Sequence, residues 1–511
     1  MNRNMLSNIV EAITKQAQAH PERIAYDYRG AQYTYRDVED QSNKLANALD
    51  AANLTAGAPV LVYGGQSFQM LVSFLALAKT GHPYIPVDTE SSTDRTRLII
   101  ETAQPALIIE VADLPFETPA KRIAYHRLMP ILSDVTELNF TPDYDLDRAF
   151  YVIFTSGSTG RPKGVPISHA NLLSFVNWVV DSDLLGPANS LLQPPFSFDL
   201  SVMATYPTLV SGGTLKVLPQ ANTKSFKDLF AMLSQLEVND WVSTPTFAEL
   251  CMVDPNFNAS KYPTLRSFIF CGEELTVATA AALKKRFPEA KVINTYGPTE
   301  ATVAITSVEI TDEMIANDRR LPIGRVKPDT TVVVRPQVMT DEQGDEILSS
   351  GELMITGPSV AAGYLNAPEQ TAKVFLKNAD NTMTYATGDL GHFDHDLLYY
   401  EGRLDHQIKL NGYRIELEEV AFHLRQLPAV DKGVVVPEYG KDHRVKRLVA
   451  VVVLNASLKA DSDVAMRIRH DLSTTLMPYM VPARILFRDE LPVNGNGKVA
   501  VKQIAQEVNE A

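Results

Sequence analysis

One stretch, residues 151–165 with the sequence YVIFTSGSTGRPKGV, limits most strongly what this chain can fold into. It opens with an apolar run of four residues, which predicts a buried strand. The ten residues after Phe154 contain three glycines, four hydroxyl side chains, Arg161 and Lys163. Glycine lets backbone N–H groups approach an anion closely, and the hydroxyls and cations add further donors. We therefore predict a phosphate-binding loop at the end of a strand.

This loop differs from the common nucleotide-binding loop. Lys163 follows a proline and precedes Gly164, whereas the common pattern places Ser or Thr after its lysine. A flexible, glycine-rich surface loop is the alternative interpretation, and short Gly/Ser runs usually are such loops. The strand before the loop and the two cations within it favour phosphate binding.

The first 150 residues alternate between expected helices and strands. Residues 36–49 and 68–79 have the apolar spacing of helices, and residues 60–63 and 106–109 are short buried-strand candidates. Such alternation predicts an α/β fold with parallel-rich sheets and helices on both faces. Ligands of such sheets bind beyond the carboxyl ends of the strands, where the loop after Phe154 is expected.

A chain of 511 residues is long enough for two or more domains. Residues 403–511 carry a net charge of +2, whereas the first 402 residues carry −16. Because the composition shifts near Arg403, we predict a large N-terminal domain over residues 1–402 and a small C-terminal domain over residues 403–511. Strand-like runs at 433–437 and 448–454 predict that the small domain is α+β.

Composition also excludes several classes of function. The net charge of −14 argues against a nucleic-acid partner, because phosphate contacts need a basic face. The longest near-apolar run, residues 70–78, is too short to insert through a membrane, and the N-terminus has no signal-peptide core, so we expect a cytoplasmic protein. Cys251 and Cys271 lack the spacing of a disulfide framework or a zinc site and are expected to be free thiols.

Asp199 lies between apolar residues in the sequence FDLS. It has two interpretations with about equal support. It caps a helix that begins at Leu200, or it is a buried counter-ion for the ammonium group of a ligand, because a carboxylate in an apolar pocket needs a cationic partner.

Two further segments follow apolar runs, SFIFCGEE at residues 267–274 and NTYGPTE at residues 294–300. In the second, Gly-Pro predicts a tight turn, Asn294 and the threonines can reach a nucleobase or phosphate, and Tyr296 can stack. Glu300 can hold a hydrated Mg²⁺. Together with the phosphate loop, this segment is expected to form a second wall of a nucleotide site.

Near the end of the large domain, Asp389 in TYATGDL can bind both ribose hydroxyls or simply form a turn. Lys498 lies in the glycine-rich segment LPVNGNGKV, where a solvated lysine is the more common outcome.

In this order, these segments resemble the adenylate-forming superfamily, which includes acyl-CoA ligases and the adenylation domains of peptide synthetases. The resemblance spans nearly the whole chain and includes AKTG at 78–81, YIPVD at 84–88, the phosphate loop, FDLS, NTYGPTE, TGDL, residues 402–420 and NGNGK. It implies that a carboxylate attacks the α-phosphate of ATP to give an acyl-adenylate, and that a thiol then displaces AMP.

The resemblance also implies roles for individual residues. Lys498, Arg403 and Lys163 would be catalytic, and Glu300 would hold Mg²⁺. Asp405 would be the hinge of a mobile small domain, and Gly412 would leave room for a pantetheine arm. ATP would be bound by Thr155, Ser156, Asn294, Thr295, Tyr296, Gly297, Pro298, Thr299, Asp389, Tyr400, Glu401, Gly402, Arg403 and Lys498.

The resemblance implies an amino-acid substrate, because Asp199 matches the aspartate with which the amino-acid-activating branch of the superfamily binds the α-ammonium group of its substrate. FDLSV and NTYGPTEATVAIT are similar to segments of the D-alanine:D-alanyl carrier protein ligases, which supply D-alanine for lipoteichoic acid. This implies D-alanine contacts from Asp199, Cys271, Val303 and Lys498. A stand-alone enzyme is expected, with a separate, acidic, phosphopantetheinylated carrier protein as its partner.

Cys271 replaces a glycine that many adenylation domains have at this position, so its thiol could shrink the pocket to fit a methyl group. A buried small hydrophobe is an equally good interpretation. Two rival functions remain open: adenylation of another small amino acid for peptide synthesis, and a catalytically inactive nucleotide sensor.

Overall fold

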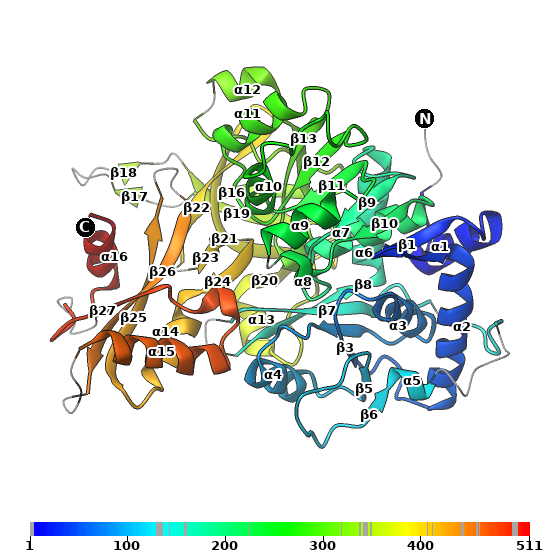
Figure 1. Cartoon of the computed structure of the whole chain (residues 1–511), viewed down its shortest axis with the longest axis horizontal. Helices are drawn as coiled ribbons and strands as arrows, with labels where there is room; N and C mark the ends of the chain where they lie inside the picture. Colours follow the sequence, from blue (N-terminus) through cyan, green and yellow to red (C-terminus); the bar gives the residue numbers. More distant parts are fainter. Residues whose placement is uncertain are drawn as a thin grey trace. The chain divides into compact units, whose positions relative to one another are not determined.

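The computed structural model describes residues 5–128, 136–142, 144–157, 161–223, 225–317, 319–336, 339–340, 346–347, 350–405, 407–410, 412–440, 444–455, 458, 460–492 and 499–510. The chain divides into two compact units (Figure 1). The first comprises Met1–Thr89, Ala103–Ile153 and Gly164–Gly402, and the second comprises Glu90–Thr102, Phe154–Lys163 and Arg403–Ala511. The domain boundary after residue 402 stays a prediction.

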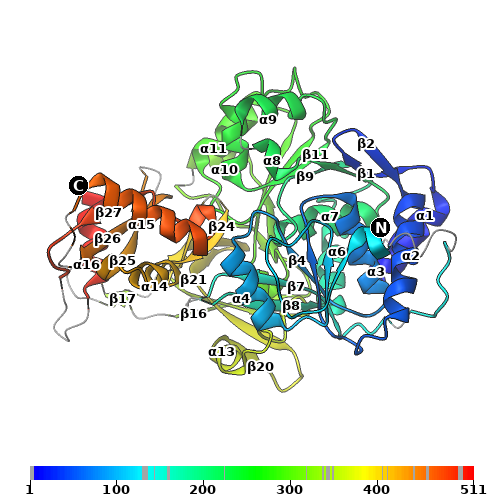
Figure 2. The same cartoon turned by 60° about the horizontal axis from the view of Figure 1, so that its bottom comes forward.

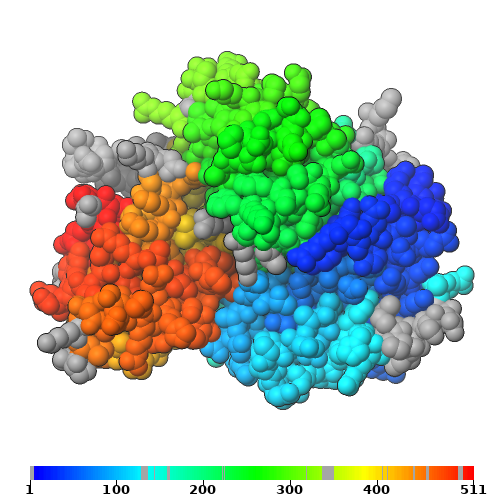
Figure 3. Space-filling view, viewed as in Figure 1, coloured from blue at the N-terminus to red at the C-terminus, as the bar shows by residue number. Residues whose placement is uncertain are grey.

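The first unit contains a nine-stranded sheet. Its central strands are parallel, and antiparallel strands lie at both edges. In spatial order the strands are β15 (Arg325–Val326), β14 (Thr306–Glu309), β13 (Lys291–Tyr296), β12 (Ser267–Phe270), β11 (Asp240–Ser243), β9 (Asn189–Leu192), β10 (Thr214–Val217), β1 (Ile24–Tyr28) and β2 (Ala31–Thr34). The pairing of β1 with β10 brings the N-terminal segment, dark blue in Figure 3, against the green middle of the chain.

Successive side chains of a strand point to opposite faces of the sheet, and every residue of the central strands β11 and β12 is buried, so both faces are covered there. In β12, Phe268 and Phe270 pack into one apolar core, whereas Ile269 packs into the other. Trp241 and Val242 of β11 divide in the same way. The core that contains Phe268 is covered by α9 (Phe226–Leu233), α10 (Pro245–Met252) and α11 (Val277–Arg286), which lie together in Figures 1 and 2.

A six-stranded sheet contains the strand that leads into the predicted phosphate loop. Its order is β6 (Arg122–Ala124), β5 (Leu107–Glu110), β3 (Val60–Tyr63), β4 (Tyr84–Val87), β7 (Ala149–Thr155) and β8 (Lys163–Ser168). The pairs β3–β4, β3–β5, β4–β7 and β5–β6 are parallel. The predicted strands at residues 60–63, 106–109 and 151–154 are therefore confirmed, as is the α/β class.

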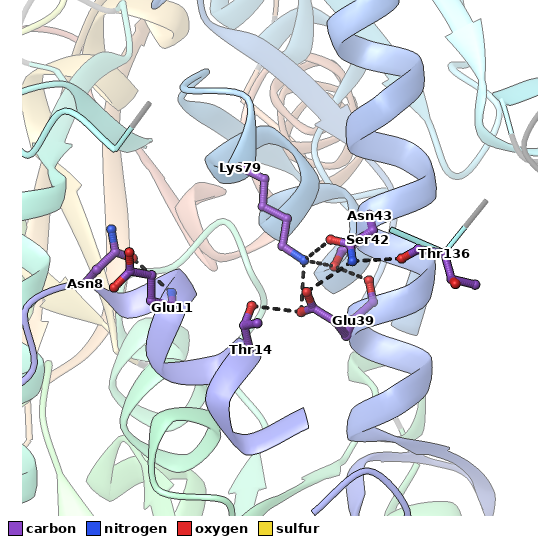
Figure 4. A network of polar contacts seen from close by, with 8 residues as sticks. All are labelled: Asn8, Glu11, Thr14, Glu39, Ser42, Asn43, Lys79 and Thr136. Atoms are coloured by element: carbon purple, nitrogen blue, oxygen red, sulfur yellow. Dashed lines mark hydrogen bonds and ion pairs between the residues drawn. The ribbon is translucent and has the colours of Figure 1, made fainter. Parts of the chain in front are cut away.

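Three N-terminal helices of the first unit, α1 (Ile9–Ala19), α2 (Tyr35–Ala51) and α3 (Phe68–Lys79), share a buried polar network (Figure 4). Lys79 Nζ lies 3.0 Å from Glu39 Oε2, 2.8 Å from Ser42 Oγ and 2.6 Å from Asn43 Oδ1. Burial lowers the pKa of Lys79, and Glu39 opposes this shift. The Thr14 hydroxyl of α1 also donates to Glu39 Oε2 at 3.0 Å, so the network joins α1, α2 and α3, whereas the sequence predicts α2 and α3 only as separate helices.

A third sheet of the first unit follows the nine-stranded one in the chain. Its strands are β16 (Thr331–Pro336), β19 (Gly351–Thr356), β21 (Met383–Asp394) and β20 (Phe375–Lys377), and β22 (Leu397–Arg403) pairs with β21. The remaining elements of this part of the chain are α5 (Tyr125–Leu128), α6 (His169–Asp181), α7 (Leu200–Val210), α8 (Gln220–Thr223), η2 (Thr299–Ala301), α12 (Asp312–Asn317), β17 (Met339–Thr340), β18 (Glu346–Ile347) and α13 (Pro368–Val374).

The second unit contains a hairpin and a three-stranded sheet. The hairpin pairs β23 (Gln407–Leu410) with β24 (Tyr413–Glu416), and Gly412 in its turn has a φ of +84°, which favours glycine. The sheet contains β25 (Val430–Tyr439), β26 (Val445–Leu454) and β27 (Arg484–Phe487). The helical segments are α4 (Thr93–Ala103), α14 (Leu417–Arg425), α15 (Ser462–Thr475), η3 (Pro478–Met480) and α16 (Val501–Glu510).

Alternating valines of β25 supply two cores of the second unit. Val435 packs with residues of α14 and α15, whereas Val434 and Val436 pack with residues of α16. The expected strands at 433–437 and 448–454 lie within β25 and β26 and are confirmed. Among the described helices of both units, none is both long and apolar enough to cross a membrane.

Candidate active site

Three predicted site segments of the first unit follow parallel strands of the nine-stranded sheet. The loop that carries Asp199 follows β9, Cys271 comes directly after β12, and Gly297 comes directly after β13. Because these strands are parallel, their carboxyl ends meet at one edge of the sheet. The residues around Asp199, Cys271 and Gly297 therefore come together although they are far apart in the sequence.

Asp199 occupies the position before helix α7, but its carboxylate does not cap that helix. Its side chain makes no capping hydrogen bond, and its backbone is already helical. Instead, Thr299 Oγ1 donates a hydrogen bond to Asp199 Oδ2 at a distance of 2.6 Å. The carboxylate is buried. The structure thus favours the counter-ion interpretation, since a buried carboxylate that does not cap a helix suits a cationic ligand.

Tyr151 is a buried polar neighbour of this carboxylate. Burial raises the pKa of Tyr151, and the charge of Asp199 raises it further, so the phenol stays neutral. Within the described residues, the Tyr151 hydroxyl has no hydrogen-bond partner. An unsatisfied buried hydroxyl close to a buried carboxylate fits a site that takes a polar ligand or an ordered water.

The loop that carries Asp199 is itself held by a second carboxylate. The Ser197 backbone N–H donates to Asp88 Oδ2 at 3.2 Å, and the Ser197 hydroxyl bonds the same oxygen. Asp88 is buried and comes directly after β4. The YIPVD motif predicts no role for Asp88, whereas the structure shows that its carboxylate holds Ser197, two residues before Asp199.

Cys271 and Val303, two of the four residues predicted to contact D-alanine, are in contact. The Cys271 thiol lies 3.6 Å from the Val303 carbonyl oxygen, and both residues are buried. Thr302 and Val303 have φ angles of +59° and +69°, which β-branched residues rarely adopt. The Thr302 hydroxyl donates to the Ser359 carbonyl at 2.7 Å and stabilises this backbone. Such strain concentrates at functional sites.

The NTYGPTE segment is anchored by its own side chains. The Asn294 amide donates to the Pro322 carbonyl at 2.8 Å, and the Thr295 hydroxyl donates to the Phe270 carbonyl at 2.8 Å. A Cβ atom at Gly297 would lie 2.6 Å from the Ala304 Cα, so only glycine fits there. Asn294 to Tyr296 thus form the end of β13, Gly297 and Pro298 follow it directly, and Thr299 begins η2; their contacts with ATP remain a prediction.

Tyr296 connects this turn to the third sheet. Its hydroxyl donates to Asp389 Oδ2 at 2.5 Å, and its ring centroid lies 6.4 Å from that of Tyr400 on β22. Asp389 is buried on β21. Its backbone N–H donates a hydrogen bond to the Thr387 hydroxyl at 2.9 Å, which fixes its position on the strand. The predicted adenine and ribose residues therefore lie side by side, with Glu401 and Gly402 following Tyr400 on β22.

Glu300 is fully buried in η2, one residue after Thr299. Among the described residues, no group of three or more His, Cys, Asp and Glu side chains could hold a metal ion. A single carboxylate nevertheless suits Mg²⁺, which keeps several waters and is usually held by one or two carboxylates together with substrate phosphates. Glu300 therefore fits a magnesium ion that arrives with ATP.

In the second unit, donors of the predicted phosphate loop already contact oxygen acceptors. The Gly157 backbone N–H donates to Glu419 Oε2 at 3.1 Å, and the Ser156 hydroxyl donates to the Arg414 carbonyl at 2.8 Å. Lys163 Nζ lies 3.8 Å from Glu416 Oε1. Burial raises the pKa of Glu419, and Arg95 opposes this shift. These contacts fit a loop that can bind an anion.

Thr155 offers a further donor of the same loop. Its hydroxyl is buried and has no hydrogen-bond partner in the part of the chain that the structure describes. A phosphate oxygen would satisfy it, so Thr155 fits the predicted contact with ATP. Residues 158–160 of the loop lie outside the described residues.

Arg403, another predicted catalytic residue, forms a bidentate pair with Asp405. Arg403 Nε and Nη2 donate to Asp405 Oδ1 and Oδ2 at 2.7 and 2.8 Å. Burial raises the pKa of Asp405, but the hydrogen bonds and charge of Arg403, the Gln407 N–H and the charge of Arg414 together hold that pKa below its usual range. Lys498 is the last of the three predicted catalytic residues. It lies outside the described residues, so its role stays a prediction.

Several residues of these sites were missed by reasoning from the sequence. Glu416 and Glu419 contact the phosphate loop, and Tyr364 contacts Glu300. No spacing rule connects them to their partners, because the contacts join distant parts of the chain. The pair Gly363-Tyr364, a glycine directly before an aromatic residue, is a local signal that could have drawn attention to Tyr364.

Two family models match the chain. The model described as AMP-binding enzyme matches residues 13–365, and the model described as AMP-binding enzyme C-terminal domain matches residues 417–498. The matched residues include Asp199, Cys271 and Glu300 in the first model and Lys498 in the second.

Solved structures support the same fold. An adenylation domain from Vibrio cholerae, in complex with glycyl-adenosine-5'-phosphate, has a TM-score of 0.80 at 22% identity and 99% coverage of both chains. The o-succinylbenzoate CoA synthetase of Bacillus subtilis has a TM-score of 0.79 at 21% identity, with 97% of this chain and 98% of that chain covered. At this identity the likeness concerns the fold alone.

Relatives of much higher identity narrow the assignment. A D-alanine--D-alanyl carrier protein ligase of Lacticaseibacillus rhamnosus is 48% identical over 516 residues, covering 99% of this chain and 100% of the relative. The enzyme with the same name from Streptococcus pneumoniae (strain 70585) is 44% identical, and both chains are covered completely. The chain therefore belongs to the AMP-binding enzymes and, within them, to the family of D-alanine--D-alanyl carrier protein ligases.

Proposed function

We propose that this protein activates D-alanine with ATP and transfers the D-alanyl group to a separate carrier protein. The contact between Thr299 and Asp199, 2.6 Å long, carries the proposal. It joins the carboxylate suited to an α-ammonium group directly to the turn suited to ATP, so the two substrates meet there. The full-length relatives named as D-alanine--D-alanyl carrier protein ligases support the choice of amino acid and acceptor.

In the first half-reaction, a carboxylate oxygen of D-alanine attacks the α-phosphorus of ATP. The bond to the bridging oxygen breaks, and D-alanyl-AMP and pyrophosphate form. Charge builds up at phosphorus, so cations should dominate catalysis. We assign this role to Lys163, Arg403 and Lys498, and Mg²⁺ bound at Glu300 would supply further charge neutralisation.

In the second half-reaction, a thiolate attacks the carbonyl carbon of D-alanyl-AMP, and AMP leaves with the electron pair of the acyl–oxygen bond. We propose that the thiol belongs to the phosphopantetheine arm of an acidic carrier protein, and that the D-alanyl groups serve lipoteichoic acid. Because the reaction consumes ATP, we place it in the cytoplasm.

Amino-acid-dependent exchange of labelled pyrophosphate into ATP tests the first half-reaction. D-alanine, L-alanine and glycine are compared at equal concentration in ATP and Mg²⁺. Strong exchange with D-alanine, followed by loading of a phosphopantetheinylated carrier, is expected. Preference for glycine or L-alanine would move the protein to peptide synthesis, and no exchange with any amino acid would favour the alternative of a catalytically inactive nucleotide sensor.

The contact between Cys271 and Val303 supports a role in stereoselectivity. We propose that the thiol takes the space that an L-side chain would need. Replacing Cys271 with Ala removes the sulfur, so the ratio of D- to L-alanine exchange should fall about tenfold, since a buried group of this size discriminates by about 1–3 kcal/mol.

Cys251 provides the matched control for this substitution. It is also buried, in the core beneath α9, α10 and α11, and has no part in the proposed pocket. Cys251→Ala should leave the ratio of D- to L-alanine exchange unchanged. If Cys271→Ala also leaves it unchanged, the thiol is only a small buried hydrophobe.

A further inference from the structure

The proposed metal ligand, Glu300, has a specific hydrogen-bond donor in the first unit. The Tyr364 hydroxyl donates to Glu300 Oε1 at 2.8 Å, and the pair is buried. The two residues are 64 positions apart in the sequence. A neutral phenol supplies direction to a carboxylate without cancelling its negative charge, so the charge of Glu300 stays available to a cation.

Tyr364 is held so firmly that its hydroxyl has little freedom to move. Its ring packs edge-on against Phe375, with centroids 5.3 Å apart, and its backbone N–H donates to Thr371 Oγ1 of α13 at 2.9 Å. Gly363 has a φ of +146°, and a Cβ atom there would lie 2.4 Å from Thr371 Cγ2. The segment before Tyr364 can therefore approach α13 only with glycine at this position.

The same segment also forms backbone hydrogen bonds with two other parts of the first unit. The Ala361 N–H donates to the Glu300 carbonyl at 2.8 Å, and the Leu365 N–H donates to the Gly164 carbonyl at 2.8 Å. Residues 361–365 thus fix the main chain of Glu300, the side chain of Glu300 and the residue that follows Lys163 in sequence.

We propose that Tyr364 is a positioning residue, which orients the Glu300 carboxylate so that it can hold the Mg²⁺ bound to ATP. The inference rests on the proposed role of Glu300. Residues that hydrogen-bond a metal-ligating carboxylate fix its orientation, and their loss typically lowers metal affinity or activity 10- to 100-fold. A purely structural role would instead be limited to satisfying a buried carboxylate.

Tyr364→Phe tests the inference, because it removes only the hydroxyl and keeps the ring against Phe375. We expect the Mg²⁺ concentration for half-maximal D-alanine-dependent pyrophosphate exchange to rise about tenfold. Calorimetric binding of a non-hydrolysable ATP analogue gives a second readout. The ratio of its dissociation constants without and with Mg²⁺ should shrink in the variant, while the affinity without Mg²⁺ should not change.

Two further variants serve as controls for the positioning role of Tyr364. Tyr385→Phe changes another buried tyrosine whose ring centroid lies 4.9 Å from that of Phe375, so it controls for altered packing and should leave the Mg²⁺ midpoint unchanged. Thr371→Val removes the acceptor of the Tyr364 N–H and should shift the midpoint in the same direction as Tyr364→Phe, by a smaller factor.

Glu300→Gln separates the two hypotheses. If it abolishes the Mg²⁺ effect on analogue binding while Tyr364→Phe leaves both the midpoint and the binding ratio unchanged, the positioning role is overturned and the metal ligand stands. If Glu300→Gln keeps the full Mg²⁺ effect, the proposed metal ligand is wrong, and the positioning role fails with it. Thermal unfolding of each variant identifies any loss of fold.

Discussion

At the scale of single residues, three buried aspartates have different roles because their surroundings differ. Asp199 stands where a helix-capping residue would stand, yet its carboxylate bonds Thr299 instead of the helix. The Asp88 carboxylate accepts a hydrogen bond from Ser197 in the loop before Asp199, and the Asp389 carboxylate accepts one from the Tyr296 hydroxyl. What decides each role is the donor that faces the carboxylate, because a buried anion is stable only where donors or a cation meet it.

Asp199→Asn should raise the KM for D-alanine about 100-fold, because the buried charge partner of the ammonium group is lost at a cost of about 3 kcal/mol. The KM for ATP should change little. Propionate, which lacks the ammonium group, distinguishes this cause from misfolding. The variant should lose most of the preference for D-alanine over propionate in pyrophosphate exchange, and a preserved preference would contradict the counter-ion role.

At the scale of secondary-structure elements, buried polar side chains connect helices that hydrophobic spacing leaves unpaired. Lys79 at the end of α3 bonds Glu39, Ser42 and Asn43 of α2 (Figure 4). His169 at the start of α6 plays a similar part for α1, since its Nε2 accepts the Ile9 N–H at 3.0 Å. Burial lowers the pKa of His169 to about 4, so the ring is neutral when folded.

The pKa of His169 predicts how stability depends on pH. The unfolded chain binds this proton near pH 6.5, whereas the folded chain binds it only near pH 4, so stability is lost as the pH falls between these values. Between pH 7 and pH 5 the loss from this residue is about 2 kcal/mol. In His169→Gln, which keeps an acceptor for Ile9, the free energy of unfolding should fall less over this interval, and an equal fall would refute the assignment.

At the scale of the whole molecule, charge is divided unevenly along the chain. Residues 403–511 carry a net +2, and the first 402 residues carry −16. An acidic carrier protein would be repelled by most of the chain and least by the C-terminal part. The proposed partner therefore predicts that electrostatics contributes to carrier recognition.

Raising the ionic strength tests this prediction, because salt screens contacts between exposed charges. The KM for the carrier in D-alanine loading should rise several-fold between about 0.05 and 0.5 M NaCl, as the Debye length falls from more than 10 Å to less than 8 Å. D-alanine-dependent pyrophosphate exchange, which needs no carrier, is the control and should change less. A KM for the carrier that does not depend on salt would rule out charge-guided docking.

The sequence by itself determined the α/β class, the strand before the phosphate loop and the order of the site segments. Those features depend on residue types and on apolar spacing within a few residues, as in the run from Tyr151 to Phe154. Only the tertiary structure decided that Asp199 faces Thr299, that Tyr364 holds Glu300 and that Lys79 joins α2 to α3. These contacts join residues that are distant in sequence, so they depend on how strands order themselves in a sheet and on which buried polar groups must find partners.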